Sequence, residues 1–121
     1  MKALQKSVKQ LFDEHNWDYE LERIPSVGYA LHISWYSPAG EDLNTDIELP
    51  EYFTIEDIYD AFNSKYEDFD VDEHVEMWVA HRGEGGCPST VKELLEDAEA
   101  IDDELREVVD ELRKLYLKGV R

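Results

Sequence analysis

The sequence predicts an α+β domain in which a three-stranded antiparallel meander follows one helix and precedes three more, the last of them long. Apolar and polar residues alternate across residues 17–49, interrupted by two short turn sequences, which is typical of half-buried strands. After residue 54 the apolar spacing changes to three and four, which is typical of helices that pack through one face. The 121 residues, 1–121, are expected to form a single domain because they are too few for two ordinary ones.

The first half of the chain is predicted to contain one helix and three strands. Residues 2–15 place apolar side chains at spacings of three and four, which indicates an amphipathic helix. Residues 17–24, 29–36 and 43–49 are the strands, and the connections between them contain Pro and Gly. Three strands joined by short turns form a meander, which is expected to have one apolar face and one mostly acidic face.

The second half is predicted to be helical. Thr54 is placed to cap one helix, and Asp70 with Glu73 fits a capping box at the start of the next, which ends at Gly83. A long helix follows over about residues 89–118. The middle helix is expected to bury Val71, Val75 and Trp78, with Met77 as a further candidate.

The long helix carries the clearest periodic signal in the chain. Its apolar residues alternate spacings of three and four without a break for more than three heptads. Two alternatives stay open: the helix packs along its own domain and extends past it, or it pairs with a second copy in a homodimer. The seam residues of such a dimer are Ile101, Leu105, Val108, Leu112 and Leu115.

Charge is the most distinctive feature of the composition. The chain has 30 acidic and 12 basic residues and a formal net charge of −18, while 42% hydrophobic content is typical of a folded domain. All the acids lie in residues 13–111, which hold 5 bases and therefore carry 5 − 30 = −25. Such a charge disfavours direct binding to nucleic acids or anionic membranes. It is either a solvated surface or a surface that attracts basic partners.

The sequence is expected to belong to a cytoplasmic protein. No apolar run approaches the roughly 20 residues of a spanning helix, and the N-terminus has no apolar core of a signal peptide. The single cysteine, Cys87, excludes an internal disulfide.

An alternating run of aspartates suggests calcium at first sight. Asp68, Asp70 and Asp72 follow the spacing of an EF-hand loop, which requires Gly at its sixth position and Glu at its twelfth. Glu73 and Val79 occupy those positions instead. Helix capping explains the run better, and no metal or other cofactor is expected.

Two histidines and the cysteine are the remaining candidates for chemistry. His74 and His81 lie seven residues apart on one predicted helix, and Cys87 follows shortly after, yet no paired metal-binding motif is present. Cys87 precedes a helix start, which can activate a nucleophile, but no protease or redox signature surrounds it. His32 falls among Ala30 and Ser34 on the second face of the central strand, where a structural role is expected and a site on the open sheet face is the alternative.

Several segments resemble small acidic proteins carried by bacterial phages and conjugative elements. The resemblance covers about residues 37–105 and rests on Ser37–Asp42, on Tyr66–Asp70 with His74, Met77 and Trp78, and on Pro88–Ser89 and Leu94–Glu99. That group has no assigned activity, so no catalytic residue carries over. The resemblance implies a setting in which small acidic proteins inhibit host defence, and in which anti-restriction and anti-CRISPR proteins mimic the charge of DNA.

Three functions follow as hypotheses. The first is a non-enzymatic acidic protein that mimics a nucleic acid and inhibits a bacterial nuclease or DNA-binding protein. The second is a homodimeric structural or regulatory adaptor built on the long helix, and the third is an enzyme or metal-binding module around His74, His81 and Cys87. For the first, the carboxylates expected to stand in for phosphates are Glu41, Asp42, Asp46, Glu48, Asp57, Asp60, Asp68 and Asp72.

Overall fold

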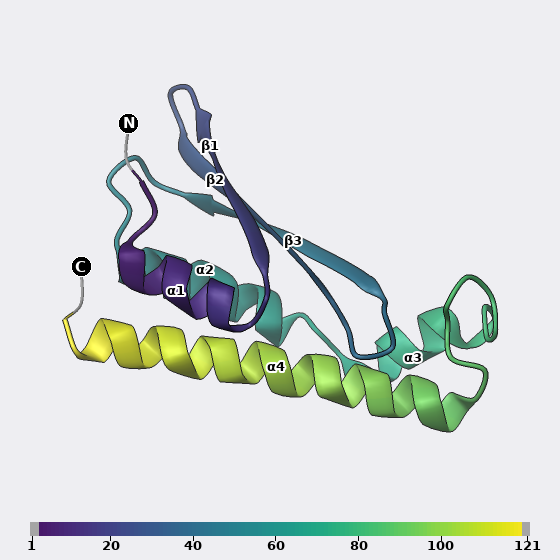
Figure 1. Ribbon diagram of the computed structural model, residues 1–121. Coiled ribbons are helices and arrows are strands. Elements are labelled where there is room, and N and C mark those ends of the chain that lie inside the picture. The colour runs from purple at the N-terminus through teal and green to yellow at the C-terminus, as the bar shows by residue number, and fades with distance from the viewer. Residues whose placement is uncertain (1–2, 120–121) are drawn as a thin grey trace.

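The computed structural model describes residues 3–119 and confirms the predicted α+β class (Figure 1). A helix precedes three strands, and three helices follow them. The elements are α1 (Lys6–Glu14), β1 (Asp18–Ile24), β2 (Gly28–Tyr36), β3 (Asp42–Leu49), α2 (Ile55–Glu67), α3 (Val71–Val79) and α4 (Val91–Leu117).

The three strands form one antiparallel sheet in the order β1-β2-β3. Leu21 pairs with Leu31, which pairs with Ile47, so this row of side chains crosses all three strands. Because side chains alternate between the faces of a strand, this row points to one face and its neighbours point to the other. The apolar rows face the helices, with Leu31 and Ile47 fully buried.

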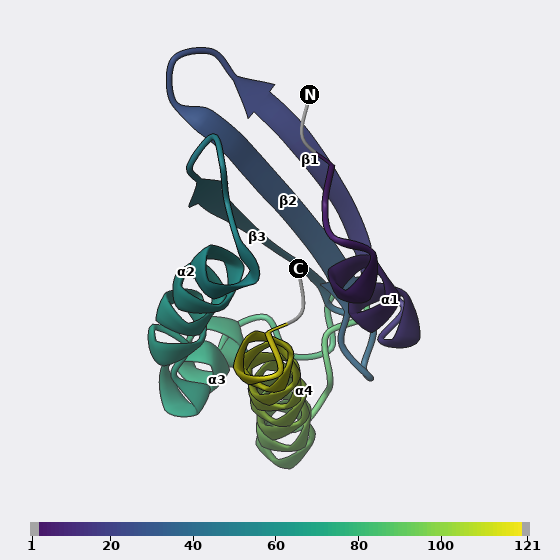
Figure 2. The same cartoon turned by 90° about the vertical axis from the view of Figure 1, so that its left-hand side faces the viewer.

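The helices form a layer on the apolar side of the sheet. Figure 2 shows α4 lying between α1 and α2, and α3 continues the layer beyond α2. An aromatic cluster fills the space between the layers, where the rings of Trp17 and Trp35 stack with centroids 4.4 Å apart. Phe12 and Phe62 pack against Trp17 at 5.8 and 5.7 Å, which joins α1, the sheet and α2 into one core.

Side-chain caps start three of the helices, as the sequence indicates. Thr54 and Asp57 form a full capping box at α2, and Thr90 accepts a hydrogen bond from the Glu93 amide at α4. Asp70 caps α3 by accepting from the Glu73 amide at 3.0 Å. The reciprocal bond expected from the Glu73 side chain is not found in the described chain, so Asp70 is a simple cap.

Two element boundaries and one burial prediction differ from the sequence analysis. α1 begins at Lys6 rather than at residue 2, which lies outside the described residues, and α3 ends at Val79 rather than at Gly83. No residue of α3 is buried, because this helix packs against α4 and makes no comparable contact with the sheet. Val71, Val75 and Trp78 are only half-buried, and Met77 is exposed.

The heptad face of α4 is the inner face of the domain. α4 runs the whole length of the helical layer, from α1 and α2 at one end to α3 at the other (Figure 1). The residues expected at a dimer seam are therefore occupied within their own chain and are not exposed to a second copy. Its apolar residues pack on the core of their own chain: Ile101, Leu105, Val108 and Leu112 are buried, and Leu115 is half-buried.

Candidate functional site

The face of the sheet turned away from the helices carries carboxylates of both outer strands. Glu20, His32 and Asp46 form one row across the three strands, and Glu22, Ala30 and Glu48 form the next. Apart from Gly28, every described residue on this face is exposed or half-buried, and none is Lys or Arg. We call the six carboxylates that share it the acidic sheet face: Asp18, Glu20, Glu22, Asp42, Asp46 and Glu48.

A single histidine sits at the centre of the acidic sheet face. His32 Nδ1 lies 2.6 Å from Asp46 Oδ1, and His32 Nε2 lies 3.2 Å from Glu22 Oε1. These hydrogen bonds, first that with Asp46 and then that with Glu22, raise the pKa of His32 above its usual value. The protonated ring joins all three strands and offsets part of the repulsion between the carboxylates.

The eight carboxylates expected to contact a basic partner lie in three different places in the structure. Asp42, Asp46 and Glu48 lie on the acidic sheet face. The other five do not share this face: Glu41 turns inward to contact His74, and the remaining four belong to the helical layer, on the other side of the sheet. The four carboxylates of the helical layer are Asp57, Asp60, Asp68 and Asp72.

The eight carboxylates singled out from the sequence include none from β1, although β1 contributes three to this surface. Asp18, Glu20 and Glu22 alternate with Trp17, Tyr19 and Leu21, so their common face was already visible in the sequence. The predicted meander already placed β1 and β3 on either side of the central strand. Only the structure shows the register, which puts Glu20 and Asp46 in one row across β2 and Glu22 and Glu48 in the next.

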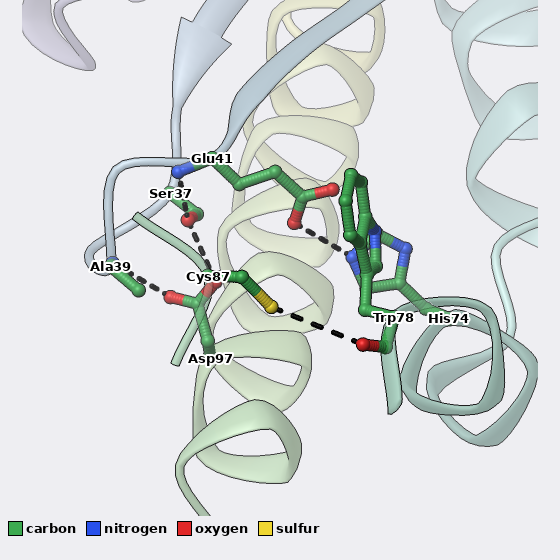
Figure 3. Close-up of polar contacts among 7 residues, drawn as sticks. All are labelled: Ser37, Ala39, Glu41, His74, Trp78, Cys87 and Asp97. Atoms are coloured by element: carbon green, nitrogen blue, oxygen red, sulfur yellow. Dashed lines mark hydrogen bonds and ion pairs between the residues drawn. The ribbon is translucent and has the colours of Figure 1, made fainter. Parts of the chain in front are cut away.

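A cavity of about 270 Å³ lies at the β2–β3 turn, where α3, α4 and the 84–88 segment meet that turn. Figure 3 shows Glu41, His74, Trp78, Cys87 and Asp97 gathered there from these separate parts of the chain. The cavity opens beside the acidic sheet face, because Asp42 belongs to both.

Asp97 anchors the turn that forms one wall of the cavity. Its carboxylate accepts hydrogen bonds from the Ser37 hydroxyl at 2.7 Å and from the Ala39 amide at 2.9 Å. The Glu41 amide donates in turn to Ser37 Oγ at 3.0 Å. The side chains of Ser37 and Asp97 are buried, so a buried network of hydrogen bonds holds the turn against α4.

Glu41 and His74 form a second polar pair in the cavity. Glu41 Oε2 lies 2.8 Å from His74 Nε2, and the two side chains are 20% and 13% exposed. The ring of Phe69 packs against that of His74 with centroids 5.3 Å apart. The pair is therefore fixed in orientation by both a hydrogen bond and an aromatic neighbour.

Of the three residues considered for enzyme or metal chemistry, His74 and Cys87 line this cavity, and His81 is not among its lining residues. Cys87 Sγ lies 4.0 Å from the Trp78 carbonyl oxygen, and no hydrogen bond joins it to His74 within residues 3–119. His81 is exposed and contacts Glu84 at 3.1 Å. Across the same residues no three His, Cys, Asp or Glu side chains are arranged to hold a metal ion.

The architecture that carries these features is a small α+β domain with one side of its sheet uncovered and acidic. Comparisons with protein-family models, with curated proteins and with solved structures find no match to the chain. Among the described helices, none combines the length and the apolar character needed to cross a membrane.

Proposed function

We propose that this protein is a non-enzymatic acidic interaction protein that binds a basic surface of another protein through the acidic sheet face. The observation that carries the proposal is the strand register, which aligns carboxylates of β1 and β3 on either side of His32. A face without helices, lysines or arginines among its described residues is open to a partner of opposite charge. Complementary charge gives fast association and a strong dependence on salt.

The spacing of these carboxylates supports a more specific form of the proposal, a mimic of nucleic acid. From Asp42 to Glu48 the strand advances about 20 Å at about 3.4 Å per residue. Six carboxylates on two strands over this length amount to about one negative charge per 3.4 Å before the charge of a protonated His32 is subtracted, close to the axial charge density of one strand of DNA. The partner would be a bacterial nuclease or DNA-binding protein, and the protein would act in the cytoplasm, where such partners bind DNA.

The decisive experiment compares two triple variants that lose the same charge from opposite sides of the domain. The first replaces three residues of the acidic sheet face that have no hydrogen-bond partner through their side chains in the described chain: Asp18→Asn, Glu20→Gln and Glu48→Gln. The control replaces three exposed residues of α2 and α4: Asp60→Asn, Glu99→Gln and Glu107→Gln.

Both variants are titrated against a panel of purified bacterial nucleases and DNA-binding proteins holding a fluorescent DNA duplex. We expect the unmodified protein to displace the duplex from a member of the panel at low salt. The face variant should then lose about tenfold or more in apparent affinity, and the control should stay within about threefold. Equal losses in the two variants would contradict the assigned face, and no displacement from any member would contradict the mimic.

A further inference from the structure

The cavity at the β2–β3 turn has a chemistry that the acidic sheet face does not use. Its described lining contains four carboxylates and neither Lys nor Arg. Asp42 is exposed and has no hydrogen-bond partner through its carboxylate in the described chain, while Glu41 uses Oε2 to contact His74 and keeps Oε1 available. The interior therefore favours a cation. The four carboxylates are Glu41, Asp42, Glu84 and Asp97.

An aromatic wall distinguishes this cavity from a simple acidic cluster. Trp78 lines the cavity, whereas Trp17 and Trp35 are buried in the core, 2% and 6% exposed. Val75 and Leu94 extend the apolar wall beside it. A cation over the face of an indole ring is attracted by the quadrupole of the ring. An apolar wall beside carboxylates suits a weakly hydrated organic cation better than a hydrated metal ion.

The size and shape of the cavity narrow the choice of cation. About 270 Å³ is just below the range of about 300–1,000 Å³ that holds drug-sized ligands, so the cavity suits a group of side-chain size. A guanidinium is planar, weakly hydrated, stacks on aromatic rings and donates several hydrogen bonds to carboxylates. We propose that this cavity binds a guanidinium group, on an arginine side chain of a protein or on a free small compound. The proposal does not depend on the function proposed above, since the cavity can take up a free compound by itself.

The test uses three small probes and the full chain. N-acetyl-arginine amide represents a protein side chain, butylguanidine represents a free compound, and N-acetyl-citrulline amide has nearly the same shape without the charge. Binding is followed by NMR through the indole N–H of Trp78 and the backbone amides of Gly40, Gly85 and Gly86, which line the cavity. We expect saturable shifts at these signals with the two guanidinium probes and none with the citrulline probe.

A matched pair of variants tests whether guanidinium binding depends on the cavity or only on the net charge of the protein. Asp42→Asn removes a carboxylate that lines the cavity, and Glu48→Gln removes one from the same strand outside it. We expect Asp42→Asn to weaken guanidinium binding roughly threefold to tenfold and Glu48→Gln to change it by less than about twofold. Both residues are exposed, so both variants should fold.

Several outcomes would overturn the proposal: equal shifts with the citrulline probe, equal effects of the two variants, or shifts that do not saturate. If N-acetyl-arginine amide binds more tightly than butylguanidine, the ligand is a protein side chain, and the reverse order assigns a free compound. None of the probes contains DNA or a protein partner, so failure of the proposed function leaves this result unaffected.

Discussion

The Ser37 hydroxyl donates a 2.7 Å hydrogen bond to Asp97 Oδ2 across 60 positions of sequence. The other oxygen of the same carboxylate accepts from the Ala39 amide at 2.9 Å. One buried side chain of α4 therefore positions the β2–β3 turn, and with it Glu41 and the wall of the cavity (Figure 3).

Replacing Asp97 should destabilise the protein. Asp97→Ala removes the acceptor of two hydrogen bonds and leaves a buried hydroxyl without its partner, which costs about 1–3 kcal/mol. Glu99→Ala, an exposed neighbour on α4, should change the free energy of unfolding by less than about 0.5 kcal/mol. Urea denaturation measures both, and equal stabilities would show that the turn does not depend on Asp97.

Stability should depend on the protonation of His32. Its raised pKa means that the folded state favours the protonated ring. The contribution of His32 to the free energy of unfolding is therefore fully present below the pKa of the ring in the unfolded chain, about 6.5. It is lost as the pH rises through the higher pKa of the ring in the folded protein. We expect the unmodified protein to exceed His32→Gln in stability by more at about pH 6 than at about pH 8.

The hydrogen bond to Asp46 supplies the control for that prediction. Asp46→Asn removes the largest cause of the shift, so NMR titration of the His32 ring should find a pKa closer to the usual value. An unchanged titration in this variant would contradict the assignment of the shift to the cross-strand pair.

Truncating the heptad face of α4 should unfold the domain rather than separate a dimer. Leu112 is 0% exposed, and Leu112→Ala leaves a cavity in the core that costs about 2–5 kcal/mol. Leu117 is 71% exposed on the same helix, and Leu117→Ala should cost less than about 0.5 kcal/mol. Denaturation measures the loss of stability, and light scattering measures the mass in solution. If the unmodified protein is a dimer and Leu112→Ala is a folded monomer, this face is a dimer seam after all.

Gly28 should be the less replaceable of two glycines with positive φ. A Cβ at Gly28, where φ is +143°, would lie 2.2 Å from the Leu49 carbonyl oxygen, so β2 and β3 would have to separate. Gly40 has φ +91° and open space around it. Gly40→Ala should cost about 1–3 kcal/mol from backbone strain, and Gly28→Ala should cost clearly more. Similar melting temperatures for the two variants would contradict the close approach.

Much of the fold could be predicted because local sequence periodicity reports directly on burial. Tyr19 and Leu21 alternate with acidic residues, so β1 had to place the apolar side chains on one face and the carboxylates on the other. Thr54 and Thr90 mark helix starts because their hydroxyls satisfy backbone amides without any tertiary contact. α3 was less predictable, because Val71 and Val75 follow helical periodicity whether or not a sheet lies beneath them.

The candidate sites could be predicted only in part. The acidic character of one sheet face followed from alternation. The order of charged residues in the sequence could not show that Glu48 shares a row with Glu22, while Asp60 lies on a helix of the opposite layer. The cavity was even harder to predict from the sequence, because Glu41, Trp78 and Asp97 come from three separate parts of the chain and share no periodic pattern.

The sequence by itself determined the order of helices and strands, the apolar side of each, and the strongly negative charge of the protein. These properties depend on residues a few positions apart, whose relative orientation the geometry of a helix or strand already sets. Only the tertiary structure decided what covers the heptad face of α4, which carboxylates share a surface, and that Asp97 holds the β2–β3 turn. Those relationships depend on how elements pack, and packing is settled by shape and burial across the whole core.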